Sequence, residues 1–349
     1  RIAFLSLLLV LSASKLTSAP YFYRDDRPLI VAHRGASGEF PEHSLGAFTS
    51  AYRYGADFLE LDVHVTKDGH LVVNHDPTLS STFLIEPFET LFKDRKRINF
   101  QFGDKFIEGD YLIYDFTLEE LKMLRRKQRN SNRNQYLNNQ FQIYTVEEAI
   151  EVLINLNENF PRSDEEYPVG LYIEPKEYAG YKVLFGVDML DLLHETLSKY
   201  NLETIEKCTF SIPVIIQSFE FEVLLRYAQK SDLPLVYLIS GGFQDKLDFE
   251  FITKHVHGLG PSLEYITNYL DEEYNKDTPS KFVELAHSYD LAVHPYELRD
   301  DALSVEDTIL EEHRVYENKG VDGIFTEFPH TTFAAFTFFP YPNTFPFDQ

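Results

Sequence analysis

Phe58-Leu59-Glu60-Leu61-Asp62-Val63-His64-Val65 alternates apolar and polar side chains from Leu59 onward. This period of two predicts a β-strand with one apolar face and one face that carries Glu60, Asp62 and His64. Two carboxylates on one buried face repel each other and are costly to remove from water. A bound cation relieves both costs, so the pattern predicts a metal site as well as a strand.

Further strand-like runs lie on both sides of this stretch and alternate with helical patterns, which is typical of βα units and a parallel sheet. The predicted strands are Leu29–His33, Phe58–Val65, Leu71–His75, Val169–Lys176, Val214–Phe219, Leu235–Ser240, Leu291–Tyr296 and Asp322–Thr326. Eight such runs predict an α/β fold, a TIM (β/α)8 barrel. In that fold the active site lies at the carboxyl ends of the strands.

Other signals mark helix starts and interruptions of the barrel. Ser44 is the expected N-cap of one helix, and Thr145 with Glu148 predicts a capping box at the start of another. Residues 77–144 form a long insertion after the third predicted strand, and residues 331–349 form a Phe/Pro-rich C-terminal tail. The barrel domain is therefore expected over residues 28–330.

The first residues have the pattern of a secretory signal peptide. Arg1 precedes an apolar run from Ile2 to Leu11, and small residues follow up to Ala19. The run is too short to span a bilayer, which takes about 20 apolar residues. We therefore expect a signal peptide over residues 1–19, no transmembrane span, and a secreted or periplasmic protein. A buried helix is the alternative, and Pro20 leaves the cleavage site open.

The composition excludes some classes of protein. Of 349 residues, 44% are hydrophobic and 15% aromatic, which excludes a disordered chain. The 32 basic and 56 acidic side chains give a net charge of −24, so nucleic acid is not an expected partner. Cys208 is the only cysteine, and no intrachain disulfide can form. A small phosphate-containing molecule remains possible as a ligand if a divalent cation lies between it and the protein.

The strand predicted near residue 170 repeats the pattern of alternating faces. Glu174 adds a third carboxylate, and Lys176, two residues later, can meet an anion. Three carboxylates without a thiolate suit a hard cation, Ca²⁺ or Mg²⁺, better than zinc. The alternative is that these charges form ion pairs inside the barrel.

Histidines and other polar residues lie at the ends of several predicted strands. His33 and His75 can face one mouth as a general acid and a general base. Arg34 offers a planar fork for phosphate oxygens. For Gln217 and His294, contact with substrate and a structural hydrogen bond are equally good interpretations.

Residues 122–133 form a basic segment in an acidic chain. We interpret it as a solvated surface, in preference to an anion-attracting lid or a membrane patch. Its charged members are Lys122, Arg125, Arg126, Lys127, Arg129 and Arg133.

Taken together, the motifs closely resemble those of the glycerophosphodiester phosphodiesterase family over residues 28–330. The matching segments are His33-Arg34-Gly35, Pro41-Glu42-His43-Ser44, Glu60-Leu61-Asp62, Lys67-Asp68-Gly69, Val72-Val73-Asn74-His75-Asp76, Glu174-Pro175-Lys176, Gln217-Ser218-Phe219 and Asp322-Gly323-Ile324-Phe325-Thr326. His43 and the His294-Pro295-Tyr296 stretch resemble the secreted or periplasmic branch that uses calcium.

The resemblance implies a TIM barrel with a small insertion after the third strand. It also implies metal-dependent hydrolysis of a glycerophosphodiester, such as glycerophosphocholine, to sn-glycerol 3-phosphate and an alcohol. Attack by a glycerol hydroxyl and attack by water both remain open. The roles it implies are an acid–base pair of His33 and His75, phosphate binding by Arg34 and Lys176, and metal binding by Glu60, Asp62 and Glu174 with Glu42 nearby.

Two residues depart from the family pattern, namely Glu297 and Glu327. We expect them to shape the pocket for the glycerol or the alcohol and to touch neither the metal ligands nor the histidine pair. Two other functions stay open: a phospholipase D-like enzyme on lysophospholipid or sphingolipid, and a non-catalytic barrel that binds phosphodiesters.

Overall fold

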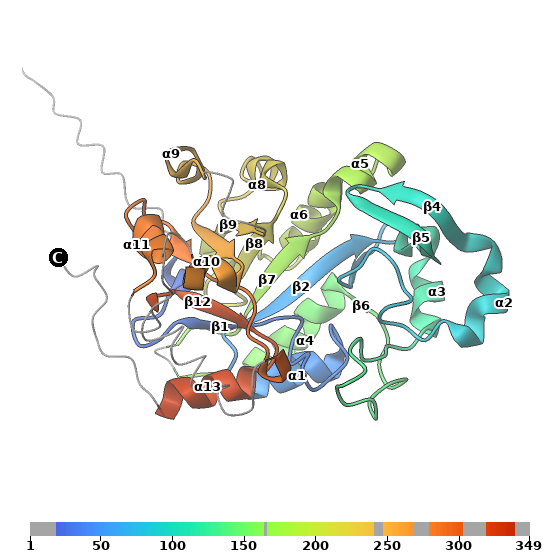
Figure 1. The fold of residues 1–349 in the computed structure, drawn as a ribbon, viewed down its shortest axis with the longest axis horizontal. Coiled ribbons are helices and arrows are strands. Elements are labelled where there is room, and N and C mark those ends of the chain that lie inside the picture. The colour runs from blue at the N-terminus through green and yellow to red at the C-terminus, as the bar shows by residue number, and fades with distance from the viewer. Residues whose placement is uncertain (1–18, 164–165, 241–246, 269–278, 303–318, 339–349) are drawn as a thin grey trace, which may run out of the picture.

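The computed structural model of the protein describes residues 19–163, 166–240, 247–268, 279–302 and 319–338. At its centre lie eight strands in the spatial order β11-β10-β9-β8-β7-β2-β1-β12, each parallel to its neighbour (Figure 1). They are β1 (Leu29–Ala32), β2 (Phe58–Val65), β7 (Gly170–Pro175), β8 (Val214–Ser218), β9 (Leu235–Ile239), β10 (Gly258–Pro261), β11 (Ala292–Val293) and β12 (Gly323–Thr326).

Backbone hydrogen bonds close this sheet into a barrel. The amide of Asp322, before β12, donates to the carbonyl of Val293 in β11 at 2.9 Å. Beyond β11, the amide of Leu298 donates to the carbonyl of Phe325 at 2.8 Å. The predicted α/β barrel is thereby confirmed.

One predicted strand is wrong in its role, and one barrel strand was not predicted. β3 (Leu71–Val73) runs antiparallel to β2 and also pairs with β6 (Tyr144–Thr145), so it is not a barrel strand. The barrel position left open is filled by β10, whose Gly-Leu-Gly-Pro sequence has no strand signal. A Cβ on Gly258 would lie 2.9 Å from the carbonyl oxygen of Ala292, so the close approach of β11 requires glycine there.

Helices lie outside the strands (Figure 1). Ser44 caps the first of them by accepting a hydrogen bond from the amide of Ala47, and Thr145 and Glu148 form a capping box, as predicted. The α-helices of the described residues are α1 (Leu45–Arg53), α2 (Glu89–Phe92), α3 (Leu118–Met123), α4 (Val146–Asn159), α5 (Tyr178–Phe185), α6 (Met189–Lys199), α7 (Ile205–Cys208), α8 (Phe221–Tyr227), α9 (Phe249–Ile252), α10 (Leu263–Asn268), α11 (Lys281–His287) and α13 (Pro329–Phe338).

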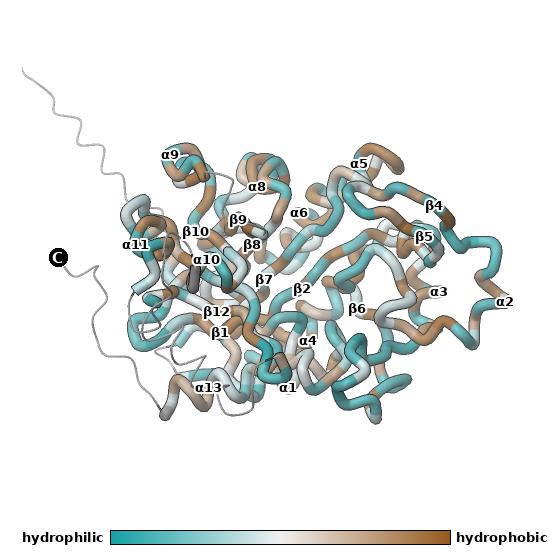
Figure 2. Tube along the Cα trace, in the orientation of Figure 1, coloured by the Kyte–Doolittle hydropathy of each residue, from teal (hydrophilic) through white to brown (hydrophobic). Residues whose placement is uncertain are grey.

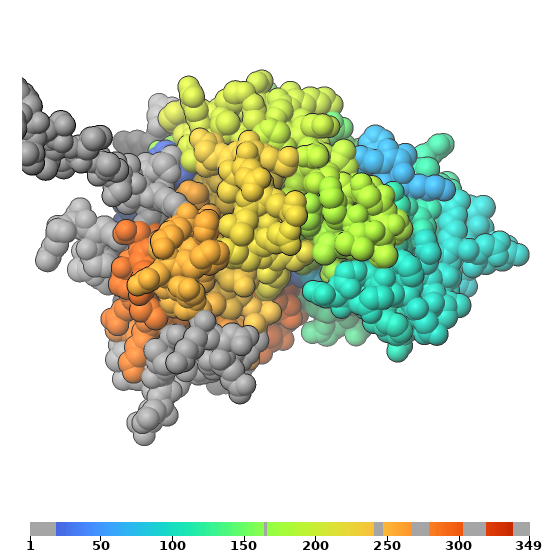
Figure 3. All heavy atoms as spheres, turned by 90° about the horizontal axis from the view of Figure 1, so that it is seen from above, coloured from blue at the N-terminus to red at the C-terminus, as the bar shows by residue number. Residues whose placement is uncertain are grey.

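The chain between β3 and β6 builds a lobe at one end of the molecule (Figure 3). Its hairpin consists of β4 (Lys96–Phe102) and β5 (Lys105–Tyr111). A separate apolar cluster that includes Phe83, Phe92 and Phe116 fills the lobe. After α3 the chain runs back along the first residues of the lobe, where the amide of Lys127 donates to the carbonyl of Thr82.

Apolar residues concentrate along the barrel strands (Figure 2), and aromatic residues cover the amino end of the barrel. Tyr21 and Phe22, in the short 3-10 helix η2 (Pro20–Phe22), are both buried. The hydroxyl of Tyr21 donates to the carbonyl of Val214, at the start of β8. The predicted signal peptide lies outside the described residues, apart from Ala19.

Part of the predicted C-terminal tail is helical. α13 packs against the barrel through Thr332, Ala335 and Phe336, which are buried, and residues 339–349 lie outside the described part of the chain. Within the described residues, no helix combines the length and the apolarity that crossing a membrane requires.

A buried ion-pair network fixes the start of β2. Asp57 accepts hydrogen bonds from both terminal nitrogens of Arg27 (2.6 and 3.0 Å), from Arg162 (2.8 Å) and from the backbone amide of Ile30 (2.8 Å). Burial alone would raise the pKa of Asp57, but Arg27, Arg162 and Arg24 outweigh it and hold the pKa well below its ordinary value of 3.8. Its charge therefore stabilises the fold.

We expect Asp57→Asn to lower the free energy of unfolding at pH 7 by about 3–5 kcal/mol, since it leaves buried guanidinium groups without their anion. The pKa of Asp57 is lower in the folded than in the unfolded chain, so its contribution is present above pH 3.8 and is lost as the pH falls below it. The difference between the wild type and the variant should therefore shrink at pH 3 in urea unfolding experiments. Asp191→Asn, at an exposed aspartate paired with Lys230, is the control and should change little.

Candidate active site

The predicted carboxylates converge at the carboxyl end of the barrel. Glu60 and Asp62 lie in β2 and Glu174 in β7, and the register places Asp62 beside Glu174. All three side chains are buried, with exposed fractions of 1, 1 and 6%. The alternation that predicted one polar face on each strand therefore holds, and it concentrates negative charge in one place.

This charge shifts the ionisation of the group. Burial and the neighbouring charge of Asp62 raise the pKa of Glu60 well above its usual range. Burial likewise raises the pKa of Glu174 to about 7, although Lys176 opposes the shift. The pKa of Asp62 is well below normal, because Lys176, His75 and the hydrogen bond from His43 outweigh its burial.

The two cations expected to bind phosphate lie among these carboxylates. Lys176 Nζ is 3.0 Å from Glu174 Oε1 and 3.5 Å from Asp62 Oδ1. The backbone amide of Arg34 donates to Glu60 Oε2 at 2.8 Å, and its guanidinium donates to Glu42 Oε2 at 3.2 Å. Arg34 has a φ of 59°, a strained conformation of the kind found at functional sites. Both cations compensate buried charge and are only about 12% exposed.

The donor set fits a hard divalent cation. Carboxylate and amide oxygens are the ligands that Ca²⁺ and Mg²⁺ prefer. The raised pKa values of Glu60 and Glu174 indicate that the neighbouring cations do not fully offset their negative charges, and a bound cation would neutralise both. Gln217 donates from Nε2 to Glu60 Oε1 at 3.4 Å, and its buried Oε1 accepts no hydrogen bond. His43, a ligand candidate missed from the sequence, donates from Nε2 to Asp62 Oδ2 at 2.9 Å and groups with Glu60 and Asp62 as possible ligands.

His75 lies near this cluster but reaches it by an unexpected path. The chain reverses after β2, and β3 runs back along it, until the amide of Asn74 donates to the carbonyl of Asp62 at 2.9 Å. His75 therefore follows an antiparallel strand. Burial and the charge of Arg34 lower its pKa, and its Nδ1 donates to Asp76 Oδ1 at 2.7 Å. His64 Nε2 donates to the carbonyl of His75 and fixes its backbone.

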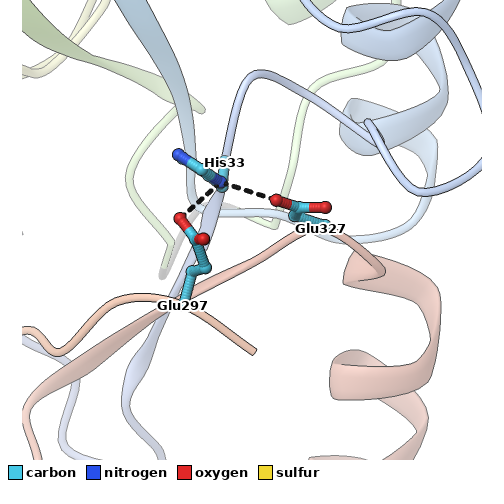
Figure 4. Close-up of side chains that lie close together, drawn as sticks. All are labelled: His33, Glu297 and Glu327. Atoms are coloured by element: carbon cyan, nitrogen blue, oxygen red, sulfur yellow. Dashed lines mark hydrogen bonds and ion pairs between the residues drawn. The ribbon is translucent and has the colours of Figure 1, made fainter. Parts of the chain in front are cut away.

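His33 is held by the two glutamates that depart from the family pattern (Figure 4). Its Nδ1 lies 3.1 Å from Glu297 Oε2 and 3.2 Å from Glu327 Oε1, while its other ring nitrogen points away from both. The expectation that neither glutamate touches the histidine pair is wrong. The reason is the closure of the barrel: Ala32 pairs with Thr326, so the residues that follow them, His33 and Glu327, lie side by side.

The interpretation of residues 122–133 as a solvated surface is wrong for three of its arginines. Arg126 is fully buried and donates to the carbonyl of Val73 at 2.5 Å. Arg129 and Arg133 turn inwards and pair with carboxylates at the mouth, including Glu42 and Glu327. The sequence does not reveal which acidic residues pair with these arginines, because those residues lie far away in the chain.

His294 lies inside the barrel wall. It is fully buried, accepts a hydrogen bond from the hydroxyl of Tyr172 at 3.1 Å, and packs against the ring of Phe22 with 5.0 Å between ring centres. Burial lowers its pKa to about 4. His294 therefore makes a structural hydrogen bond, which is one of the two interpretations that the sequence left open.

Comparison with known proteins identifies the family. The model of the Glycerophosphoryl diester phosphodiesterase family matches residues 33–331. A glycerophosphodiester phosphodiesterase of Arabidopsis thaliana is 32% identical over 326 residues, which cover 86% of this chain and 84% of the relative. One from Haemophilus influenzae is 28% identical, with 87% of this chain and 88% of the relative covered.

Solved structures share the fold. An Oleispira antarctica phosphodiesterase, solved in complex with the product sn-glycerol-3-phosphate, superposes with a TM-score of 0.58 at 22% identity. The match covers 89% of this chain and 97% of that one. A glycerophosphoryl diester phosphodiesterase from Parabacteroides distasonis gives a TM-score of 0.55 at 19% identity, with 93% and 92% covered. The chain belongs to the glycerophosphoryl diester phosphodiesterase family and is an enzyme.

Proposed function

We propose that the protein hydrolyses glycerophosphodiesters to sn-glycerol 3-phosphate and an alcohol with the help of a divalent cation. The observation that carries the proposal is the arrangement of side chains at the mouth of the barrel. There His33 and His75, each oriented through Nδ1 by a carboxylate, accompany three buried carboxylates, two of which, Glu60 and Glu174, have raised pKa values. Family membership and the names of the relatives support the same reaction.

The proposed metal ligands are Glu60, Asp62 and Glu174, with Glu42 nearby, and the proposed ion is Ca²⁺, with Mg²⁺ as the alternative. When bound, such a cation supplies charge neutralisation at the phosphoryl oxygens. Arg34 is placed to share that task through its guanidinium, a planar donor that suits phosphate. Lys176 then has a second role, since it already offsets the charge of Glu174 and Asp62.

The two histidines are proposed to move protons at Nε2. In each ring Nδ1 carries a proton that is donated to a carboxylate, Glu327 for His33 and Asp76 for His75. This arrangement leaves Nε2 free to take a proton from the attacking hydroxyl or water, or to give one to the departing alcohol. Low-pKa imidazole, as in His75, suits the role of a base at neutral pH.

We also propose that residues 1–19 direct secretion, which rests on their sequence pattern alone. Tyr21 and Phe22 belong to the folded barrel, so processing has to leave them in place. Amino-terminal sequencing of the protein recovered from the medium or periplasm should find a start before Tyr21. Retention of an unprocessed chain in the cytoplasm would contradict the proposal.

His33→Ala and His75→Ala should each lower kcat for glycerophosphocholine by about 10²- to 10⁴-fold, the usual contribution of an acid or base. The measurement is release of sn-glycerol 3-phosphate with Ca²⁺ and then with excess chelator, which should abolish the wild-type activity. His70→Ala removes an exposed histidine and is the matched control.

Full activity in either histidine variant would remove the acid–base pair from the mechanism. Turnover of lysophosphatidylcholine in clear preference to glycerophosphocholine would replace the proposed substrate with a lipid.

Calcium should raise the thermal unfolding midpoint of the wild type, since a ligand at 100 times its Kd stabilises by about 2.7 kcal/mol. Glu60→Gln and Glu174→Gln should lose this increase, because each removes a negatively charged ligand. Glu222→Gln, at an exposed glutamate paired with Arg226, should keep it. A calcium effect that survives in both ligand variants would place the ion elsewhere, and the same titration with Mg²⁺ ranks the two metals.

A further inference from the structure

Arg129, in the insertion, contacts the carboxylate that orients His75. Its NH1 donates to Asp76 Oδ2 at 2.8 Å, while Asp76 Oδ1 accepts from His75 Nδ1 at 2.7 Å. Ser81 also donates to Asp76 Oδ2. The arginine and the imidazole thus use different oxygens of one carboxylate, and the arginine restricts its rotation.

Arg133, four residues later, forms an ion pair with a carboxylate that contacts His33. Its NH2 lies 2.5 Å from Glu327 Oε2, while Glu327 Oε1 lies 3.2 Å from His33 Nδ1. The side chain of Arg133 is only 6% exposed, and Asp301 binds its Nε and NH2 at 2.7 and 2.9 Å. The order arginine, carboxylate, imidazole therefore occurs at both histidines, with one arginine of each from the same segment. At His33, Arg299 also contributes, since its Nε donates to Glu327 Oε1 at 3.1 Å.

We propose that Arg129 and Arg133 are positioning residues for the two histidines, so that the insertion sets the geometry of the acid–base pair. The proposal rests on the proposed function in assigning acid–base roles to His33 and His75. The guanidinium group of each arginine is bound to a carboxylate that contacts a histidine ring. Each acts by fixing the carboxylate that fixes the ring, and small errors in the placement of a catalytic group are costly.

The segment that carries the arginines is itself anchored beside both histidines. Arg126 donates to the carbonyl of Val73 and, at 3.2 Å, to Asn74 Oδ1, just before His75. Gln128 donates to the carbonyl of Ser37 at 3.1 Å, and the hydroxyl of Ser37 donates to the carbonyl of His33 at 2.7 Å. A positioning residue has to be held firmly, because the motion of a loosely held arginine would be passed on to the carboxylate and to the histidine ring.

The two arginines differ in one respect that an experiment can use. Arg129 also binds Glu42 through Nε and NH2, both at 2.8 Å, and Glu42 accepts from Arg34. Loss of Arg129 should therefore disturb phosphate binding by Arg34 as well as His75. In the described residues, Arg133 has no such link to Arg34, so its loss should affect His33 alone.

The test compares Arg129→Ala and Arg133→Ala with Arg97→Ala. Arg97 makes a two-pronged ion pair with Asp115 inside the insertion, at 2.7 and 2.6 Å, and serves as the matched control. The first readout is NMR of the full chain labelled with ¹⁵N-histidine, without substrate, with signals assigned by His33→Ala and His75→Ala. Arg129→Ala should change the imidazole signals of His75 and not those of His33, Arg133→Ala should do the reverse, and Arg97→Ala should change neither.

The second readout is turnover of glycerophosphocholine. Each of the two substitutions should lower kcat by roughly 10- to 100-fold, the scale expected from a misplaced catalytic group. KM should rise in Arg129→Ala and stay unchanged in Arg133→Ala. Arg129→Lys and Arg133→Lys should restore part of kcat, because they return the charge without the fork.

Unchanged imidazole signals of His75 in Arg129→Ala and of His33 in Arg133→Ala would overturn the proposal and leave the arginines as attachments of the insertion. A wild type without activity on glycerophosphocholine would instead remove the proposed function. The spectra would still decide whether the arginines orient the rings.

Discussion

Compensation of the buried charge on Asp62 organises the mouth of the barrel. His43 donates to Asp62, and Lys176 from beyond β7 and Arg34 from beyond β1 lie within 3.5 Å of it. Separate segments of the chain thus converge on one carboxylate. The backbone carbonyl of Asp62 also accepts a hydrogen bond from the amide of Asn74, which directly follows β3. Since a buried charge that loses its partner costs several kcal/mol, these segments are constrained to meet at this point.

Local patterns in the sequence predicted most of the barrel and the carboxylate set. The alternation from Phe58 to Val65 gave both the strand and the residues that face inwards, and the capping signals at Ser44 and Thr145 gave helix starts. Periodicity carries no strand direction, so the reversal at β3 was not visible. β10 was missed because glycine has a low strand propensity. The close approach of β11 nevertheless requires glycine at position 258.

The surroundings of the histidines could not be predicted, for a different reason. Glu297 and Glu327 reach His33 only through closure of the barrel, and Arg129 and Arg133 reach their carboxylates only through the return of the insertion. No local pattern marks such contacts. The basic residues in the segment 122–133 suggested a solvated surface. The acidic residues that pair with these arginines are distributed over the whole chain.

The pairing of His33 with Glu327 spans 294 positions of the chain. A contact of such long range needs both ends of the barrel domain, and closing so large a loop costs conformational entropy. On a ribosome, the chain therefore lacks the pairing of His33 with Glu327 until the last barrel strand, β12, has been made. The mouth of the barrel is therefore complete only in a chain that extends beyond β12, because Glu327 directly follows that strand.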